Sequence, residues 1–296
     1  MATIAERRSL ASRLRRWEGL PYWLVLPTLA YLALFFAWPM IQSFELAFRE
    51  EGVWTLDHLR TMKNDLRFGE AMRFTLLLIV VIVPVQFVLA IGMALLVNAK
   101  LRGRGIFLYI FLLPLAISDL AAGIVWSAIF TETGYLNTIL QRLGFLETPY
   151  IWLNPLEEHQ LLFAVVMAEI WRSTALIMII LVAGLQGIPR DYTEAAEVFG
   201  ASFFQRVRHV ILPMLKPALQ VALVLRVILA FEVFATVIAI TGASTTVLAA
   251  EAWRWQTSNF DSNVAAAYAS LILVLSVVSA GLILRLLRTP SERLLR

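Results

Sequence analysis

Ionisable side chains occupy five positions inside otherwise apolar stretches of the sequence. They are Asp119, Glu169, Arg172, Arg226 and Glu232. Charges within apolar segments of membrane length are costly, and such residues usually face a protein interior or a water-filled cavity. Glu169 and Arg172 are three residues apart and can therefore pair on one helix face. Such a pair would either lock helix packing or line a solute pathway, and the sequence leaves both interpretations open.

Residue types that catalyse reactions or bind metals do not form a recognisable group. The three histidines, His58, His159 and His209, are scattered, and the chain contains no cysteine. No G-x-x-x-x-G-K-[ST] motif or other Gly-rich phosphate-binding loop occurs. We therefore expect a non-catalytic chain that binds no metal, nucleotide or other cofactor of its own.

The composition indicates a membrane protein. Of the 296 residues, 60% are hydrophobic and only 16% are charged, and the mean hydropathy is +0.76. A soluble domain is about 45–50% apolar and about 25% charged. So much apolar surface does not fit in one soluble core, which excludes a soluble enzyme, a disordered chain and a disulfide-stapled secreted domain. The net charge of +4 is typical of cytoplasmic Lys and Arg beside a membrane and does not indicate nucleic-acid binding.

Six apolar segments have the length of about 20 residues that a membrane-spanning helix needs. We predict spans at 22–45, 72–97, 106–130, 160–187, 214–240 and 264–287, with Pro27, Pro39, Pro84 and Pro114 as points where helices kink. Sixteen Lys and Arg residues fall on one side and seven on the other, counted over loops and adjoining span ends. This bias predicts both termini in the cytoplasm. The predicted organisation is a basic segment at 1–21, a six-span domain at 22–287 and a tail at 288–296.

Two predicted outer loops carry features of their own. The loop at 131–159 is too short for a domain, but we expect a helix around 136–143. The loop at 241–263 carries Trp253 and Trp255, whose spacing of two does not place them on one helix face. These tryptophans either contact an external partner or an entering solute, or both lie at the headgroup belt.

The predicted inner segment between the fourth and fifth spans reads as two short helices. Asp191 with Glu194, and Ser202 with Gln205, have the spacing of capping boxes. Gly200 fits a left-handed stop between the two helices. Such a unit serves either as a docking surface for a partner or as an amphipathic hairpin on lipid, and local physics favours neither.

The same segment resembles the EAA loop of ABC importer permeases. It contains Glu194-Ala195-Ala196, three residues, Gly200, nine residues and then Val210-Ile211-Leu212-Pro213, against a family pattern of E-A-A-x3-G-x9-I-x-L-P. The match covers six of seven defined positions, with Val210 in place of isoleucine. Pro213 ends the unit or opens the next span. Residues 113–116, 169–174 and 181–189, with Leu26-Pro27 and Trp38-Pro39, resemble the carbohydrate-uptake (MalF-like) branch.

The resemblance implies an all-α integral membrane protein with the type I ABC importer permease fold, in a prokaryotic inner membrane. It implies a non-catalytic permease subunit that moves a sugar, oligosaccharide or polyol delivered by an extracytoplasmic binding protein. A second permease and two copies of a cytoplasmic ATPase, which holds ATP and Mg²⁺, would complete the assembly within the lipid. The loop at 188–213 would dock on the ATPase. The expected coupling residues are Glu194, Ala195, Ala196, Gly200, Leu212 and Pro213.

The polar groups within the spans form the predicted substrate pathway. Each of the five charges lies within about five residues of the middle of its span. At the helical rise per residue this is within roughly 8 Å of the membrane midplane, where transporter substrates usually bind. Asp119 and Glu232 have no basic residue at i±3 or i±4, so we expect them to face water or solute. Trp126 either adds to an aromatic face for a sugar or simply packs. The predicted pathway residues are Asp119, Glu169, Trp171, Arg172, Glu232 and Phe234.

The solute is less well defined than the fold. Val233-Phe234-Ala235 stands where many sugar permeases carry Phe-Asp, and acids outnumber bases at this level, which favours a neutral, hydroxyl-rich solute. The alternatives are a permease for glycerol phosphate, an amino acid or phosphate, and, from another class, an ion-coupled secondary transporter. The EAA spacing argues against the latter because an ion-driven carrier needs no ATPase dock. A membrane enzyme would need a catalytic group that the sequence does not offer.

Overall fold

The computed structural model describes residues 20–99, 102–242 and 244–287, and most of them are helical. Five helices are long and apolar enough to cross a membrane: Tyr22–Phe48, Phe68–Asn98, Glu158–Gln186, Phe203–Phe231 and Ser262–Leu286. A bent pair, Gly105–Ala116 with Asp119–Arg142, is the sixth candidate. The helices follow the order of the six predicted spans. Most of the predicted segments at 1–21 and 288–296 lie outside the described residues.

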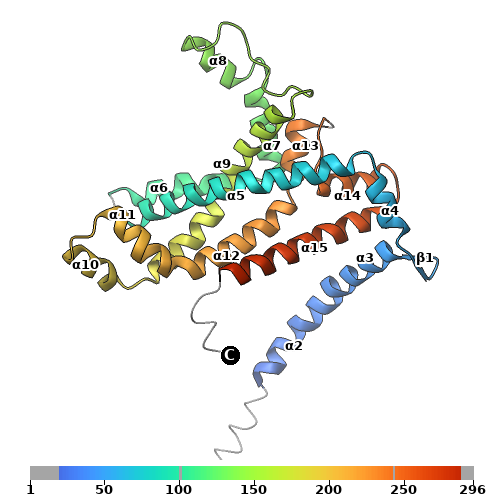
Figure 1. The fold of residues 1–296 in the computed structure, drawn as a ribbon, viewed down its shortest axis with the longest axis horizontal. Helices are drawn as coiled ribbons and strands as arrows, with labels where there is room; N and C mark the ends of the chain where they lie inside the picture. Colours follow the sequence, from blue (N-terminus) through green and yellow to red (C-terminus); the bar gives the residue numbers. More distant parts are fainter. Residues whose placement is uncertain (1–19, 100–101, 243, 288–296) are drawn as a thin grey trace, which may run out of the picture.

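Four helices pack into the core of the molecule (Figure 1). They are α5 (Phe68–Asn98), α9 (Glu158–Gln186), α12 (Leu212–Phe231) and α15 (Ser262–Leu286). Helix α9 packs against both α5 and α12. A Cβ atom at Gly184 of α9 would lie only 2.5 Å from the Cβ of Ala218 on α12. The absent side chain therefore permits this close crossing, as small residues do between membrane helices.

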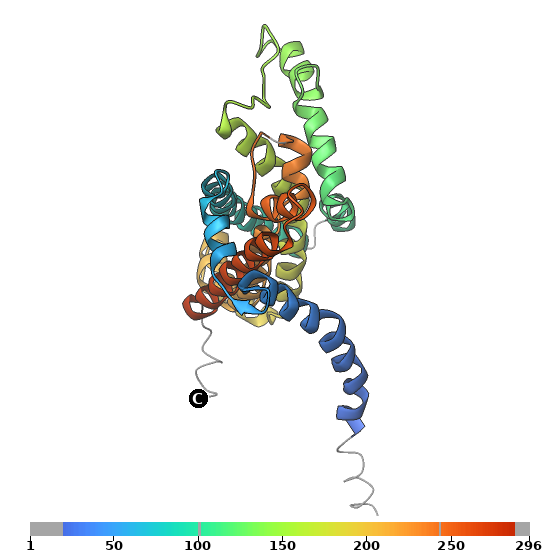
Figure 2. The same ribbon diagram turned by 90° about the vertical axis from the view of Figure 1, so that its right-hand side faces the viewer.

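The first span stands apart from the core. It comprises α2 (Leu20–Leu32), a π-helical turn η1 (Ala33–Ala37) and α3 (Trp38–Phe48). Only the end of α3 packs against α15, through the buried Ala47, while α2 diverges from the other helices (Figure 2). Residues 22–32 of α2 are all exposed and mostly apolar, so this segment requires lipid or another chain as its surroundings.

Two of the spans widen into a π-helical turn just before a proline. The turn η1 ends two residues before Pro39, and η3 (Val207–Ile211) ends two residues before Pro213. Proline lacks an N–H donor and its ring crowds the carbonyl four residues back. A local change to i→i−5 bonding, as between the N–H of Leu212 and the carbonyl of Val207, lets both helices continue.

The third predicted span bends sharply at Pro114, one of the predicted kinks. It consists of α6 (Arg104–Leu112), a 3-10 turn η2 (Leu113–Ala116) and α7 (Asp119–Phe130), with a bend of 100°. Pro114 lies in the turn, and Ile117 is extended at φ −94° and ψ 133°. The Ser118 hydroxyl then accepts a hydrogen bond from the N–H of Ala121 at 3.3 Å, which starts a new helix.

The fifth predicted span, 214–240, was wrong at both ends. Helix α12 stops at Phe231, and Glu232 to Phe234 separate it from α13 (Ala235–Thr241). At its start, α12 continues without a break from η3 and α11 (Phe203–Arg206). The second short helix predicted for the inner segment is therefore the first turn of the span.

Short elements connect the spans at the ends of the molecule. A hairpin of β1 (Arg49–Glu50) and β2 (Val53–Trp54) pairs Arg49 with Trp54, and α4 (Asp57–Asn64) follows it. Helix α8 (Tyr135–Arg142) confirms the helix predicted in the long outer loop. Its buried Asn137 accepts hydrogen bonds from the Tyr150 N–H and the Trp152 indole, which fasten the rest of that loop. Helices α10 (Arg190–Val198) and α14 (Leu248–Thr257) complete the connections.

Candidate functional site

Helix α10 carries the Glu-Ala-Ala motif, but it starts differently from the prediction. Pro189 occupies the N-cap position with φ −59° and ψ 136°, so Asp191 is already the second helical residue. No side chain caps this end, and the predicted capping box of Asp191 and Glu194 is wrong. Asp191 remains in the first turn, where the helix dipole favours its negative charge.

The end of α10 confirms the predicted left-handed stop. Gly200 has φ +77°, a conformation that costs other residues about 1–2 kcal/mol. Its N–H donates to the carbonyl of Glu197 at 2.9 Å, and the N–H of Ala201 donates to that of Ala196 at 2.9 Å. This pair of bonds is a Schellman motif, which satisfies the last carbonyls of the helix.

The predicted second capping box is also confirmed. The Ser202 N–H donates to Oε1 of Gln205 at 2.8 Å, and the Gln205 N–H donates to Oγ of Ser202 at 3.4 Å. An ion pair between Arg206 and Glu197 joins the start of the long helix to α10. The capping box and this ion pair therefore fix the orientation of α10 relative to the long helix.

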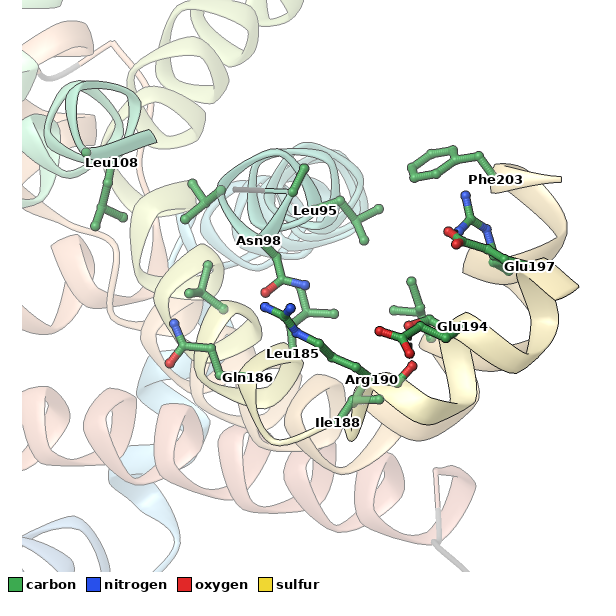
Figure 3. Close-up of a pocket in the computed structure, with 17 residues that line it drawn as sticks. Leu95, Asn98, Leu108, Leu185, Gln186, Ile188, Arg190, Glu194, Glu197 and Phe203 are labelled. Atoms are coloured by element: carbon green, nitrogen blue, oxygen red, sulfur yellow. Dashed lines mark hydrogen bonds and ion pairs between the residues drawn. The ribbon is translucent and has the colours of Figure 1, made fainter. Parts of the chain in front are cut away.

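A cavity of about 950 Å³ lies between α10 and the inner ends of α5 and α9 (Figure 3). Glu194 and Arg190 point into it toward the end of α9, and both remain exposed. Ala195 is exposed and Ala196 is half-buried on the same helix. Leu212 and Pro213 form the start of α12 instead of a boundary between separate helices.

An apolar surface covers α10 and α11, and we call it the inner surface. Its members are large hydrophobic residues that remain exposed, and no residue of α10 is buried. Phe199 is 89% exposed and Val198 is 85% exposed. The inner surface comprises Tyr192, Val198, Phe199, Phe203 and Phe204.

The intramembrane charges form a connected group around Glu169. The Glu169 carboxylate is 1% exposed, and its Oε2 accepts from Nη2 of Arg226 at 3.0 Å. The Oε1 atom accepts from the Thr236 hydroxyl at 2.9 Å. Gln86 donates to the backbone carbonyl of Glu169 at 2.8 Å and accepts from Nε of Arg226 at 2.6 Å. This group joins α5, α9, α12 and α13.

Arg172 lies within ion-pair distance of its predicted partner Glu169 and pairs more closely with Asp119. Its Nη1 lies 2.7 Å from Oδ1 of Asp119, while its Nε is 3.9 Å from Oε1 of Glu169. The i,i+3 spacing brings Arg172 near Glu169, but the carboxylate oxygens of Glu169 already accept from Arg226 and Thr236. Asp119 therefore has an ion-pair partner on α9 that its own helix does not supply, while half of its side chain is exposed.

Glu232 and Phe234 lie where α12 breaks before α13. Glu232 is exposed, and its side chain forms no hydrogen bond or ion pair with any residue that the structure describes. The Phe234 ring lies 5.9 Å from the ring of Trp253, which comes from α14. Trp171 contacts Trp126 edge to face at 6.1 Å. The break between α12 and α13 therefore carries an exposed carboxylate and, two residues later, a ring that packs against α14.

Comparison with known proteins adds a family to this geometry. The family described as "Binding-protein-dependent transport system inner membrane component" matches residues 86–291. The trehalose/maltose transport system permease protein MalF of Thermococcus litoralis is 34% identical over 79% of this chain and 81% of its own length. This chain belongs to that family of transport permeases.

Other relatives agree on the fold and differ in the solute that their names give. The permease is 33% identical to the trehalose transport system permease protein SugA of Mycobacterium tuberculosis, over 75% of this chain and 70% of SugA. It is 29% identical to the sn-glycerol-3-phosphate transport system permease protein UgpA of Yersinia enterocolitica, over 89% of this chain and 92% of UgpA. A crystal structure of a bacterial ABC transporter that imports alginate matches with a TM-score of 0.81 at 24% identity, over 95% of this chain and 98% of that chain. It supports the type I importer permease fold.

The permease also has an outer polar cluster that sequence reasoning missed. Asp65 Oδ2 accepts from Arg254 at 2.5 Å, from the Trp255 indole at 2.7 Å and from the Tyr268 hydroxyl at 3.2 Å. Arg254 also donates to Glu251 at 2.5 Å. The cluster ties the loop before α5 to α14 and α15, so Trp255 is structural, whereas Trp253 is 56% exposed.

The pKa of Asp65 reflects competition between burial and these donors. Burial raises the pKa of the carboxyl, but hydrogen bonds from the Arg67 N–H and the Trp255 indole, together with the charge of Arg254, outweigh it. The pKa therefore lies below its ordinary value.

The sequence analysis also missed Gln86, which hydrogen-bonds to Glu169 and Arg226. Its position could have been noticed, because an amide inside an apolar span requires a hydrogen-bond partner.

Proposed function

We propose that this permease subunit carries a neutral carbohydrate across a prokaryotic inner membrane, driven by ATP hydrolysis on a separate chain. The observation that carries the proposal is the break between α12 and α13. There Glu232, exposed and without an ion-pair partner among the described residues, precedes by two residues Phe234, whose ring packs against that of Trp253. Hydroxyl groups donate well to carboxylates, and the apolar face of a sugar ring packs against aromatic side chains.

The charge balance supports a neutral solute over an anion. Asp119 pairs with Arg172, and Glu169 pairs with Arg226, so these four charges cancel. Among the predicted pathway residues, Glu232 is then the one carboxylate without a basic partner. A phosphate or carboxylate would require a free cation, and both arginines already have partners.

The inner surface supports docking on an ATPase. The end of α10 is fixed by the hydrogen bonds at Gly200, and the start of α11 is fixed by the Ser202 capping box. The apolar side chains of the inner surface extend from these two helices. A fixed geometry favours a partner with a matching cleft over a fluid lipid surface. The extracytoplasmic binding protein and a second permease complete the proposed assembly. The separate first span offers that permease a large apolar surface.

The experiment that tests the proposed solute is an uptake assay. The permease, its partner permease, the ATPase and the binding protein are reconstituted in proteoliposomes and supplied with ATP. We expect uptake of trehalose or maltose, or inhibition of their uptake by a related neutral sugar. We expect no uptake of sn-glycerol 3-phosphate. Uptake of glycerol phosphate without competition from any neutral sugar would contradict the proposal.

A further inference from the structure

Glu169 has two arginines within reach but forms its hydrogen bond with only one. Arg226 donates to its Oε2 at 3.0 Å, whereas Nε of Arg172 stays 3.9 Å from Oε1. That Nε atom is buried and has no hydrogen-bond partner among the described residues. Arg172 therefore has an unused donor that faces a carboxylate already bonded to another residue.

The charges of the group pair off one to one. Arg226 balances the single negative charge of Glu169, and the guanidinium of Arg172 extends to Asp119 at 2.7 Å. Asp119 is the first residue of α7, directly after the 100° break in the third span. The Arg172–Asp119 pair thus fixes the start of α7 beside α9, on the exposed side of the charge group.

We propose that Arg226 is a positioning residue for the substrate pathway: by holding Glu169, it leaves Arg172 to hold Asp119. Arg226 is 1% exposed, so it has no contact of its own with a solute. Its effect on transport would pass through Arg172. The inference rests on the proposed pathway role of Asp119 and Arg172 and does not depend on which solute is carried.

Removing Arg226 would redirect Arg172. A buried carboxylate left without its partner is costly, and the nearest remaining cation is Arg172 on the same helix. Arg172 would turn to Glu169 and release Asp119, although no residue of the Asp119–Arg172 pair had changed. No hydrogen bond or ion pair joins Arg226 to Asp119 in the described part of the chain, so strong coupling between their mutations would point to the path through Arg172.

The test is a double-mutant cycle of Arg226→Met and Asp119→Asn in the reconstituted complex. The measurements are binding-protein-stimulated ATPase activity and uptake, each per assembled complex. We expect Asp119→Asn to lower coupled activity about 10-fold in the native background and less than about 2-fold in the Arg226→Met background. Losses that multiply would overturn the proposal, because they would show independent effects. Arg60→Met, which removes an exposed arginine elsewhere, is the control and should change nothing.

A second variant keeps the test decisive if Arg226→Met prevents assembly. Arg226→Met/Glu169→Met removes both buried charges, which proteins often tolerate, and leaves Arg172 to Asp119. In that background we expect the roughly 10-fold effect of Asp119→Asn to return. If Asp119→Asn is silent there as well, the proposal is wrong.

The start of α7 can also be followed directly, because the chain contains no cysteine. A Leu120→Cys reporter lies in the first turn of α7 and is half-exposed. We expect faster thiol labelling in Arg226→Met and the native rate in the Arg226→Met/Glu169→Met variant. Equal rates in all three proteins would contradict the positioning role. Thiol labelling does not require a carbohydrate, so failure of the proposed solute would be seen separately, in the uptake assay.

Discussion

Glu232 is the residue on which the proposed solute recognition depends most directly. It is exposed at the end of α12 with no ion pair among the described residues. We expect Glu232→Gln to lower uptake, because an amide is a weaker acceptor than a carboxylate, and Glu232→Leu to lower it further. Complex assembly and basal ATPase activity should stay unchanged in both variants.

The matched control is Glu147→Leu, which removes an exposed carboxylate from the outer loop. Normal uptake by Glu232→Leu would show that this carboxylate meets neither solute nor water in the pathway. The solute site would then have to lie among other residues of the bundle.

Asp65 gives the outer polar cluster a defined pH dependence. Its pKa is lowered in the folded protein, so the native state favours the ionised carboxylate. The resulting stability is fully present above the ordinary Asp value of about 3.9 and is lost as pH falls toward the lowered value. We expect Asp65→Asn to lower the thermal midpoint of the purified complex at neutral pH, and this difference to shrink at acidic pH. A difference that stays constant or grows as pH falls below 4 would contradict this assignment.

The charged residues of the pathway could be identified from the sequence, whereas their partners could not. An apolar segment interrupted by Glu169 or Arg226 is recognisable because charges inside a bilayer are costly. The pairing of Glu169 with Arg226 depends on how α9 and α12 cross. The two residues are 57 positions apart in the chain, and local sequence spacing carries no information on that crossing. Local spacing therefore predicted Arg172 near Glu169, and tertiary packing added Arg226 as the closer partner.

At the scale of helices, two of the spans are interrupted next to predicted pathway residues. Pro114 and Ser118 break the third span before Asp119, and the fifth span breaks at Glu232. Hydropathy could predict that these segments lie in the membrane, but it carries no information on breaks within them. The capping box at Ser202 and the stop at Gly200 could be predicted because both depend on local hydrogen bonds.

Gly184 allows α9 to cross α12 close to the inner end of the bundle. A methyl group there would lie 2.5 Å from the Cβ of Ala218 and 2.8 Å from Cδ1 of Leu215. We expect Gly184→Ala to destabilise the permease by about 1–3 kcal/mol, and Gly184→Ala/Ala218→Gly to recover part of the loss. Thermal unfolding in detergent measures this.

The control for this substitution is Gly92→Ala. Gly92 lies inside α5 with no atom within 4 Å of an added Cβ, so the change should be neutral or stabilising by up to about 1 kcal/mol. Equal effects at both glycines would show that the close crossing of α9 and α12 does not require Gly184.

Across the whole molecule, α9 and α12 connect the charge group to the inner surface. Helix α9 carries Glu169 and Arg172 and ends just before α10, while α12 carries Arg226 and continues from α11 (Figure 1). Continuous helices transmit displacement along their length, so movement of α10 would reach the charge group through both. The first span and the inner surface remain exposed because their partners are other chains or lipid in the proposed assembly.

The most direct test of the account is the binding-protein-stimulated ATPase activity of the complex with Gly200→Pro. Proline cannot adopt φ +77°, so the Schellman motif that ends α10 would be lost. The matched control is Gly144→Pro, because Gly144 closes α8 with the same motif at φ +78° on a distant part of the molecule. We predict that Gly200→Pro loses the stimulation or the ATPase subunit itself, while Gly144→Pro retains the stimulation. Normal stimulation and uptake with Gly200→Pro would contradict the claim that this loop couples ATP hydrolysis to transport.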